Sequence, residues 1–269
     1  MSQQEELEDT SAPLIEHLVE LRQRLMYSVI AIAVLFLICF YFADEIFNIL
    51  VIPYQQGAGT DDVKFIFPAL QDIFFVQIKI AFFGAIFLGF PVIATQIYSF
   101  VAPGLYKNEK GAFLPFLIAT PILFLAGACL VYFLIMPLAT SFFLSLEQVG
   151  GEGQAEITNL QSVRAYLDLI MLLIFAFGLV FQLPVAITLL SKAGLVSAET
   201  LSTKRKYAIL LAFVAAALLT PPDPVSQLGL AIPTIVLYEI SILAARRIEK
   251  QRAARENSDE SDSTDVTSS

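Results

Sequence analysis

The sequence is poor in the residues that most enzymes and secreted proteins use for catalysis and cross-linking. Its 269 residues include one histidine, two cysteines and no tryptophan, and only 15% are charged. The lone histidine, His17, precedes the first long apolar run, which excludes a serine–histidine pair inside a membrane segment. One histidine also cannot supply the axial ligands of a multi-haem subunit. Because a phosphate-binding loop is missing as well, we expect no direct use of ATP.

Basic residues are missing from the N-terminus, where a cleavable signal peptide would carry them. The net charge of −9 comes from two acidic ends: Glu5, Glu6, Glu8 and Asp9, and then Glu256, Asp259, Glu260, Asp262 and Asp265. We interpret the tail after Arg255 as a disordered, solvated end rather than an interaction tail. Cys39 and Cys129 lie in apolar runs, so we expect buried thiols and no disulfide.

Apolar residues dominate the rest of the chain. They make up 57% of the sequence, and the mean hydropathy is +0.73. A soluble domain of this size needs more charge to cover its surface. Six apolar segments predict an all-α integral membrane protein with six transmembrane helices: 25–43, 74–90, 113–138, 165–190, 207–219 and 228–245.

Lysine and arginine predict the orientation of these segments. Thirteen fall on the side of the two chain ends, and only Lys64, Lys79 and Arg164 fall on the other. This bias places the N-terminus and C-terminus in the cytoplasm. The predicted organisation is a cytoplasmic segment with an amphipathic helix (1–24), a six-helix membrane domain (25–245) and a basic, then acidic, disordered cytoplasmic tail (246–269).

Two cytoplasmic segments each carry a carboxylate near the membrane. The first, residues 11–25, has apolar residues at helical spacing and Glu20 four residues before Arg24. This pattern is equally typical of a surface helix that lies among the lipid headgroups. In that case the Glu20–Arg24 pair would only stabilise the helix, by about 0.3–0.5 kcal/mol. The second, residues 98–111, reads YSFVAPGLYKNEKG and holds Glu109 between two lysines. We expect Pro91 to separate the amphipathic stretch 92–101 from the second span.

The predicted fifth span is short. Its 13 residues extend about 20 Å as a helix, against a hydrocarbon core about 30 Å thick. Two interpretations remain open. In the first, the short span faces lipid, and either the bilayer thins locally or the flanking basic residues reach out to the headgroups. In the second, neighbouring spans shield the short span from lipid.

Four motifs resemble the TatC family, the core subunit of the twin-arginine protein translocase: HLVELRQRL, FVAPGLYKNEKGAFLP, FGLVFQLPVAITLL and LLTPPDPVSQLGLAIP. The resemblance covers nearly the whole chain. It implies a concave six-helix arrangement in the bacterial cytoplasmic (inner) membrane and transport driven by the proton motive force. The implied partners are twin-arginine signal peptides of folded substrates, TatA-type and TatB-type single-span proteins, membrane lipid and further copies of the chain, with no nucleic acid.

The resemblance also implies roles for single residues. Glu20 and Glu109 would bind the two signal-peptide arginines, because a guanidinium pairs bidentately with a carboxylate. Phe100 would line the same patch, and Arg22 would orient the N-terminal segment. The alternative for Glu109 is a local pair with a neighbouring lysine.

A second group of residues would contact partner helices, namely Gln182, Tyr132, Thr220 and Gln227. Gln182 stands where relatives often carry glutamate, and its alternative is a hydrogen bond between helices of this chain. Pro53, Pro103 and Asp223 are expected in structural or functional loops, Pro53 shaping a cap over the concave face. Asp223 is alternatively a plain helix cap. We expect Glu239 to reach or pair toward Arg246.

The remaining function class is a secondary transporter of a small solute. Such proteins usually show internal repeats and broken spans. Spans one to three do not repeat as four to six, and no span has a convincing cluster of ionisable groups. The residues therefore favour a receptor and scaffold, with no enzymatic activity, cofactor or metal.

Overall fold

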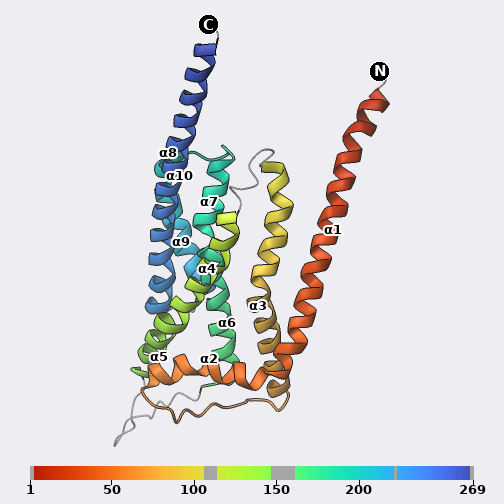
Figure 1. Ribbon diagram of the computed structural model, residues 1–269. Coiled ribbons are helices and arrows are strands. Elements are labelled where there is room, and N and C mark those ends of the chain that lie inside the picture. Colours follow the sequence, from red (N-terminus) through yellow and green to blue (C-terminus); the bar gives the residue numbers. More distant parts are fainter. Residues whose placement is uncertain (1–2, 106–113, 147–160, 221–222, 267–269) are drawn as a thin grey trace, which may run out of the picture. The chain divides into compact units, whose positions relative to one another are not determined.

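The computed structural model describes residues 3–105, 114–146, 161–220 and 223–266, and this part of the chain is helical (Figure 1). The helices are α1 (Gln3–Tyr41), α2 (Ala43–Ala58), α3 (Asp72–Leu105), α4 (Leu114–Leu130), the π-helical turn η2 (Val131–Ile135), α5 (Met136–Leu144), α6 (Val163–Val180), α7 (Leu183–Lys192), α8 (Ala198–Thr203), α9 (Arg205–Leu219) and α10 (Pro224–Val266). Extended pairing among the described residues is limited to one bridge between Ile66 and Ser162.

Five helical segments of the described chain are long and apolar enough to cross a membrane. They are His17–Tyr41, Asp72–Phe100, Pro115–Leu144, Val163–Lys192 and Pro224–Gln251. These five correspond to the predicted first, second, third, fourth and sixth spans. The predicted fifth span corresponds to α9, whose 15 residues are too few to meet this length. A total of six crossings, with α9 as one of them, therefore stays a prediction.

Several helices run past the ends that the sequence predicts. The expected break at Pro91 is wrong, because α3 continues through Pro91 and Pro103 to Leu105. Proline is tolerated inside membrane helices, where serine and threonine side chains can bond freed backbone groups. Pro91 lacks the N–H that an α-helix directs to the carbonyl at position 87. One turn further on, the Thr95 hydroxyl donates to the carbonyl oxygen of Pro91 itself at 2.7 Å.

Near both ends of the chain, a membrane helix continues beyond the span that the sequence predicts. The N-terminal amphipathic segment and the first span form one helix, α1. At the other end, α10 continues to Val266, whereas the composition of the tail predicts disorder. After Pro233 this stretch contains no proline or glycine, so its backbone ladder has no residue that would end it.

The chain divides into two compact units: residues 1–51 with 67–121, and residues 52–66 with 122–269. In the first unit, α1 packs on α3. A Cβ at Gly84 of α3 would lie 2.9 Å from the sulfur of Cys39, which is buried as predicted. The close approach therefore depends on the missing side chain.

In the second unit, α4 and α6 meet backbone to backbone. A Cβ at Gly127 would lie 2.7 Å from the Phe177 carbonyl oxygen, and one at Gly178 would overlap the ring of Phe124. Small residues allow such contacts between membrane helices. Cys129, on α4, is exposed, so its predicted burial is wrong. An apolar run in a membrane helix does not distinguish the face toward lipid from the face toward protein.

Candidate functional site

Charged and aromatic side chains meet where α1 packs on α3, within the first unit. We call His17, Glu20 and Arg24 of α1, with Phe100 of α3, the α1–α3 site. The Glu20 Oε1 accepts a hydrogen bond from the Arg24 Nε at 2.9 Å and another from Nη2. The other oxygen, Oε2, lies 3.8 Å from the His17 Nδ1. The Glu20 carboxylate thus has arginine at one oxygen and imidazole near the other.

The His17 ring lies flat on the Phe100 ring. Their centroids are 4.1 Å apart, and the planes differ by 15°. This stack joins α1 to α3, and His17 thereby contacts both Phe100 and Glu20. Glu20 and Phe100 are predicted at this site from the sequence, whereas His17 is not. The available signal was the spacing of three between His17 and Glu20, which puts both on one helix face.

The other residues predicted for this site are less defined by the structure. Arg22 is exposed on α1. Glu109, with Lys107 and Lys110, lies outside the described residues. Pro103, expected in a loop, lies within α3. The structure therefore brings together Glu20 and Phe100 and leaves the place of the second carboxylate open.

Gln182 stands between α6 and α7. Its Nε2 donates to the Gly178 carbonyl oxygen at 3.3 Å, one turn back on α6. This bond lies within one turn of the chain, so it differs from the interhelical bond considered as an alternative. Side chain to backbone bonds of this kind are common where a helix bends or ends.

Asp223 caps α10, as its alternative interpretation predicts. Its Oδ1 accepts from the Ser226 backbone N–H at 2.7 Å. Thr220 ends α9 and donates its hydroxyl to the Ala216 carbonyl oxygen, while Gln227 lies in the first turn of α10. Tyr132 lies in the π-helical turn η2. Pro53, expected in a loop, lies inside α2.

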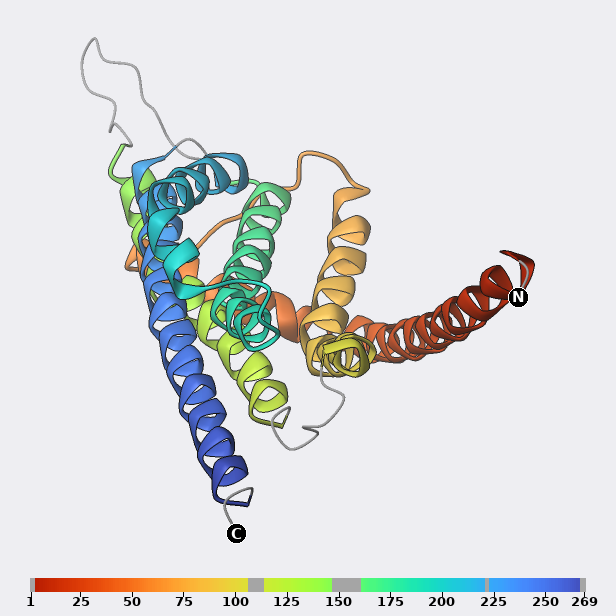
Figure 2. The same cartoon turned by 90° about the horizontal axis from the view of Figure 1, so that it is seen from above.

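Glu239 pairs with Arg205 of α9. Its Oε2 accepts a hydrogen bond from the Arg205 Nη2 at 2.9 Å, and its Oε1 lies 2.9 Å from the Arg205 Nε in the same ion pair. The sequence predicts that Glu239 reaches or pairs toward the basic end of its helix near Arg246, and the structure supplies Arg205 as the partner. A partner 34 residues away cannot be found from local spacing. The Tyr238 hydroxyl also donates to the Leu201 carbonyl oxygen at 2.8 Å. Figure 2 shows α9 and α10 as neighbours from a second direction.

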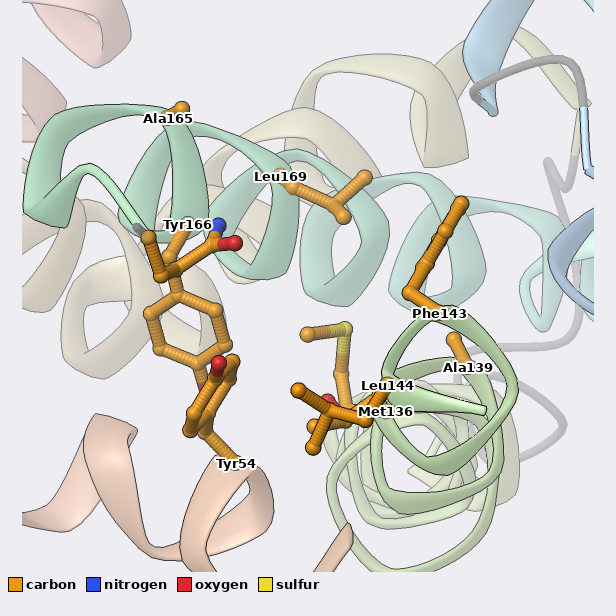
Figure 3. A pocket seen from close by; sticks show the side chains of 10 residues that line it. Tyr54, Met136, Ala139, Phe143, Leu144, Ala165, Tyr166 and Leu169 are labelled. Atoms are coloured by element: carbon orange, nitrogen blue, oxygen red, sulfur yellow. The ribbon is translucent and has the colours of Figure 1, made fainter. Parts of the chain in front are cut away.

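A cavity of about 400 Å³ lies in the second unit. Figure 3 shows the rings of Tyr54 and Tyr166 along one part of its wall and Met136 and Leu144 along another. The two tyrosine rings meet edge to face at 5.2 Å. The wall is largely apolar, and the described residues contain no group of three or more His, Cys, Asp or Glu side chains that could hold a metal ion.

The family model for the Sec-independent protein translocase protein (TatC) matches residues 16–233. The chain belongs to the TatC family. A TatC protein of Magnetococcus marinus is 50% identical over 252 residues, which cover 94% of this chain and 90% of that protein. The Escherichia coli K12 TatC protein is 40% identical over 242 residues, covering 89% and 90%.

Solved structures agree with this assignment. A crystal structure of the twin-arginine translocase receptor TatC has a TM-score of 0.74 and 37% identity, and the match covers 87% of this chain and 99% of that one. The predicted resemblance to the TatC family is thereby confirmed. The chain is a multi-pass membrane protein and a protein-transport subunit of the Tat system.

Proposed function

We propose that this TatC-family chain is the core subunit and receptor of a twin-arginine translocase in the bacterial cytoplasmic membrane. It binds the twin-arginine signal peptide of folded proteins at its cytoplasmic face. The observation that carries the proposal is the α1–α3 site. His17 links its two main parts, because its ring stacks on Phe100 of a second helix while its Nδ1 lies 3.8 Å from the partly exposed carboxylate of Glu20.

The chemistry of the site suits an arginine ligand. A guanidinium pairs with a carboxylate through two parallel hydrogen bonds and stacks on aromatic faces. The Glu20–Arg24 pair holds the carboxylate in place, but a pair four residues apart on a helix is worth only about 0.3–0.5 kcal/mol. A signal-peptide arginine can therefore replace Arg24, or use the second carboxylate oxygen, at little cost.

Glu109 supplies the second carboxylate in this proposal. A pair of adjacent arginines is read best by two carboxylates, and the motif that contains Glu109 is one of those shared with the family. Lys107 and Lys110 keep Glu109 ionised and disfavour cations that lack the guanidinium geometry. Arg22 orients the N-terminal segment.

The test is binding of a labelled twin-arginine peptide to the full-length chain in nanodiscs. Glu20→Gln and Glu109→Gln should each weaken binding about tenfold, since a hydrogen bond to a charged group contributes roughly 1.5–3 kcal/mol and exposure keeps it near the lower end. Glu45→Gln is the matched control, because Glu45 is exposed on α2 away from this site in the sequence. Unchanged binding, with an unchanged preference for arginine over lysine, would overturn the proposal.

The proposed topology has six spans in a concave arrangement, with both ends in the cytoplasm and α9 as the short fifth span. A cysteine at Thr203, exposed in α8, should resist a membrane-impermeant thiol reagent added to intact cells. A cysteine at Thr60, exposed after α2, should react. Both belong in a background without Cys39 and Cys129, because Cys129 is exposed. Labelling at position 203 would contradict the topology.

We further propose that the chain scaffolds TatA-type and TatB-type single-span partners and assembles in several copies. Gln182, Tyr132, Thr220 and Gln227 are the proposed contacts, with Pro53 of α2 shaping the cap. Gln182→Leu should reduce crosslinking to a partner helix by several-fold and leave peptide binding in place. Loss of the folded protein instead would assign Gln182 to the internal bond with Gly178.

A further inference from the structure

We infer that His17 is a further positioning residue of the α1–α3 site. The His17 ring holds Phe100 close to Glu20, and protonation of His17 weakens the binding of a signal-peptide arginine. The inference rests on the proposed function. It assigns a role in recognition to the only histidine of the chain.

The contacts of His17 cross from one helix to another. Its ring covers the Phe100 ring at a centroid distance of 4.1 Å, so α1 and α3 are joined at the position where the peptide is proposed to bind. Half of the His17 side chain is exposed, and its Nδ1 lies 3.8 Å from the Glu20 Oε2. Stacked aromatic rings stabilise each other beyond the effect of the area they bury. Removal of the ring therefore frees both Phe100 and Glu20 to move.

Few charged groups face the imidazole in the described part of the chain. On α1 they are the Glu20 carboxylate and, beyond it, the Arg24 guanidinium. On α3, Phe100 covers the ring, and the neighbouring titratable side chain in the sequence is Tyr98, whose hydroxyl accepts from Thr120 at 2.9 Å. The Glu20 carboxylate is thus the charged group that the structure places beside the imidazole.

The two protonation states differ in what they offer an arginine. With neutral His17, the Glu20 Oε2 is open to an incoming guanidinium. With protonated His17, a positive charge lies beside that oxygen and repels the ligand. Histidine changes its charge between about pH 5 and 8, while carboxylates ionise mainly below this range. Affinity for a twin-arginine peptide should therefore fall as the pH is lowered from about 8 to about 5.5.

The experiment uses the full-length chain in nanodiscs and a labelled twin-arginine peptide without histidine, at constant ionic strength. Native protein should bind about twofold to fourfold more weakly at pH 5.5 than at pH 8, the range expected for one exposed charge pair. His17→Phe keeps the stacked ring but carries no proton, so its affinity should be nearly the same at both pH values. His17→Ala lacks the stack and should bind more weakly than His17→Phe at pH 8.

The outcomes separate this inference from the proposed function. A His17→Phe variant with the native pH dependence, or a His17→Ala variant that binds like His17→Phe, would overturn the role of His17 even if Glu20→Gln still weakens binding. If Glu20→Gln binds like the native chain, the proposed function itself fails. Folding is checked in parallel by the thermal midpoint of each variant, and weak binding by a variant with a native midpoint supports the positioning role.

Discussion

The described part of the chain contains two glutamate–arginine pairs that have similar geometry and differ in what they connect. Glu20 and Arg24 lie four residues apart on α1, whereas Arg205 and Glu239 lie 34 residues apart and join α9 to α10. Both pairs have an N–O distance of 2.9 Å, and both are partly exposed. The two pairs therefore differ in sequence separation and not in distance or burial. The pair within α1 can open to bind another arginine, whereas the pair between α9 and α10 holds two helices together.

The position of the Arg205–Glu239 pair matches the length of α9. The 15 residues of α9 extend about 22 Å. Glu239 lies 15 positions after Pro224, the first residue of α10, so it is about 22 Å along that helix. The Arg205–Glu239 pair thus closes one end of a helical hairpin whose other end is the turn capped by Asp223. Opening it would release the first turn of α9, whereas opening the Glu20–Arg24 pair leaves α1 helical.

The largest expected effect comes from exchanging the two charges of the local pair. The double variant Glu20→Arg with Arg24→Glu keeps a pair on α1 but moves the carboxylate one helical turn, about 6 Å, from the Phe100 ring. Affinity for a twin-arginine peptide should fall at least about tenfold, the loss of one charged hydrogen bond. Peptide anisotropy measures this effect. The thermal midpoint should change little, and affinity equal to that of the native chain would show that the position of Glu20 does not matter.

A smaller effect is expected from reversing one charge of the long-range pair. Arg205→Glu should destabilise the folded chain by about 1 kcal/mol, because two carboxylates then face each other and exposure screens them. The double variant Arg205→Glu with Glu239→Arg should recover most of this loss. Thermal unfolding in detergent gives the comparison. Failure of the double variant to recover stability would mean that the pair does not hold α9 to α10.

The smallest effect is expected at a contact between α10 and α8, the short helix that precedes α9. Tyr238→Phe removes the hydroxyl that donates to the Leu201 carbonyl oxygen and leaves the ring in place. The expected cost is about 0.5 kcal/mol, the lower end for a neutral hydrogen bond at a partly exposed site. In the double variant with Arg205→Glu, the loss of stability should exceed the sum of the two single losses, because α8 leads directly into α9 and both contacts hold this segment on α10. Simple additivity would show that the two contacts act independently.

Local sequence patterns predicted the helical class, five of the membrane segments and the cap at Asp223. They failed where the deciding group is far away in the chain or where the surroundings are apolar. Pro91 stays inside α3 because a membrane helix gains more from continuing its backbone bonds than from breaking at proline. Cys129 is exposed because an apolar run does not show which face meets protein.

The sequence by itself determined that this is a helical membrane protein of the TatC family, since hydropathy and the four motifs are properties of consecutive residues. Only the tertiary structure decided that Glu239 pairs with Arg205 and that His17 covers Phe100. Those contacts join residues of different helices that are far apart in the sequence. Helical spacing predicts which side chains share a face, but packing between helices decides which faces meet.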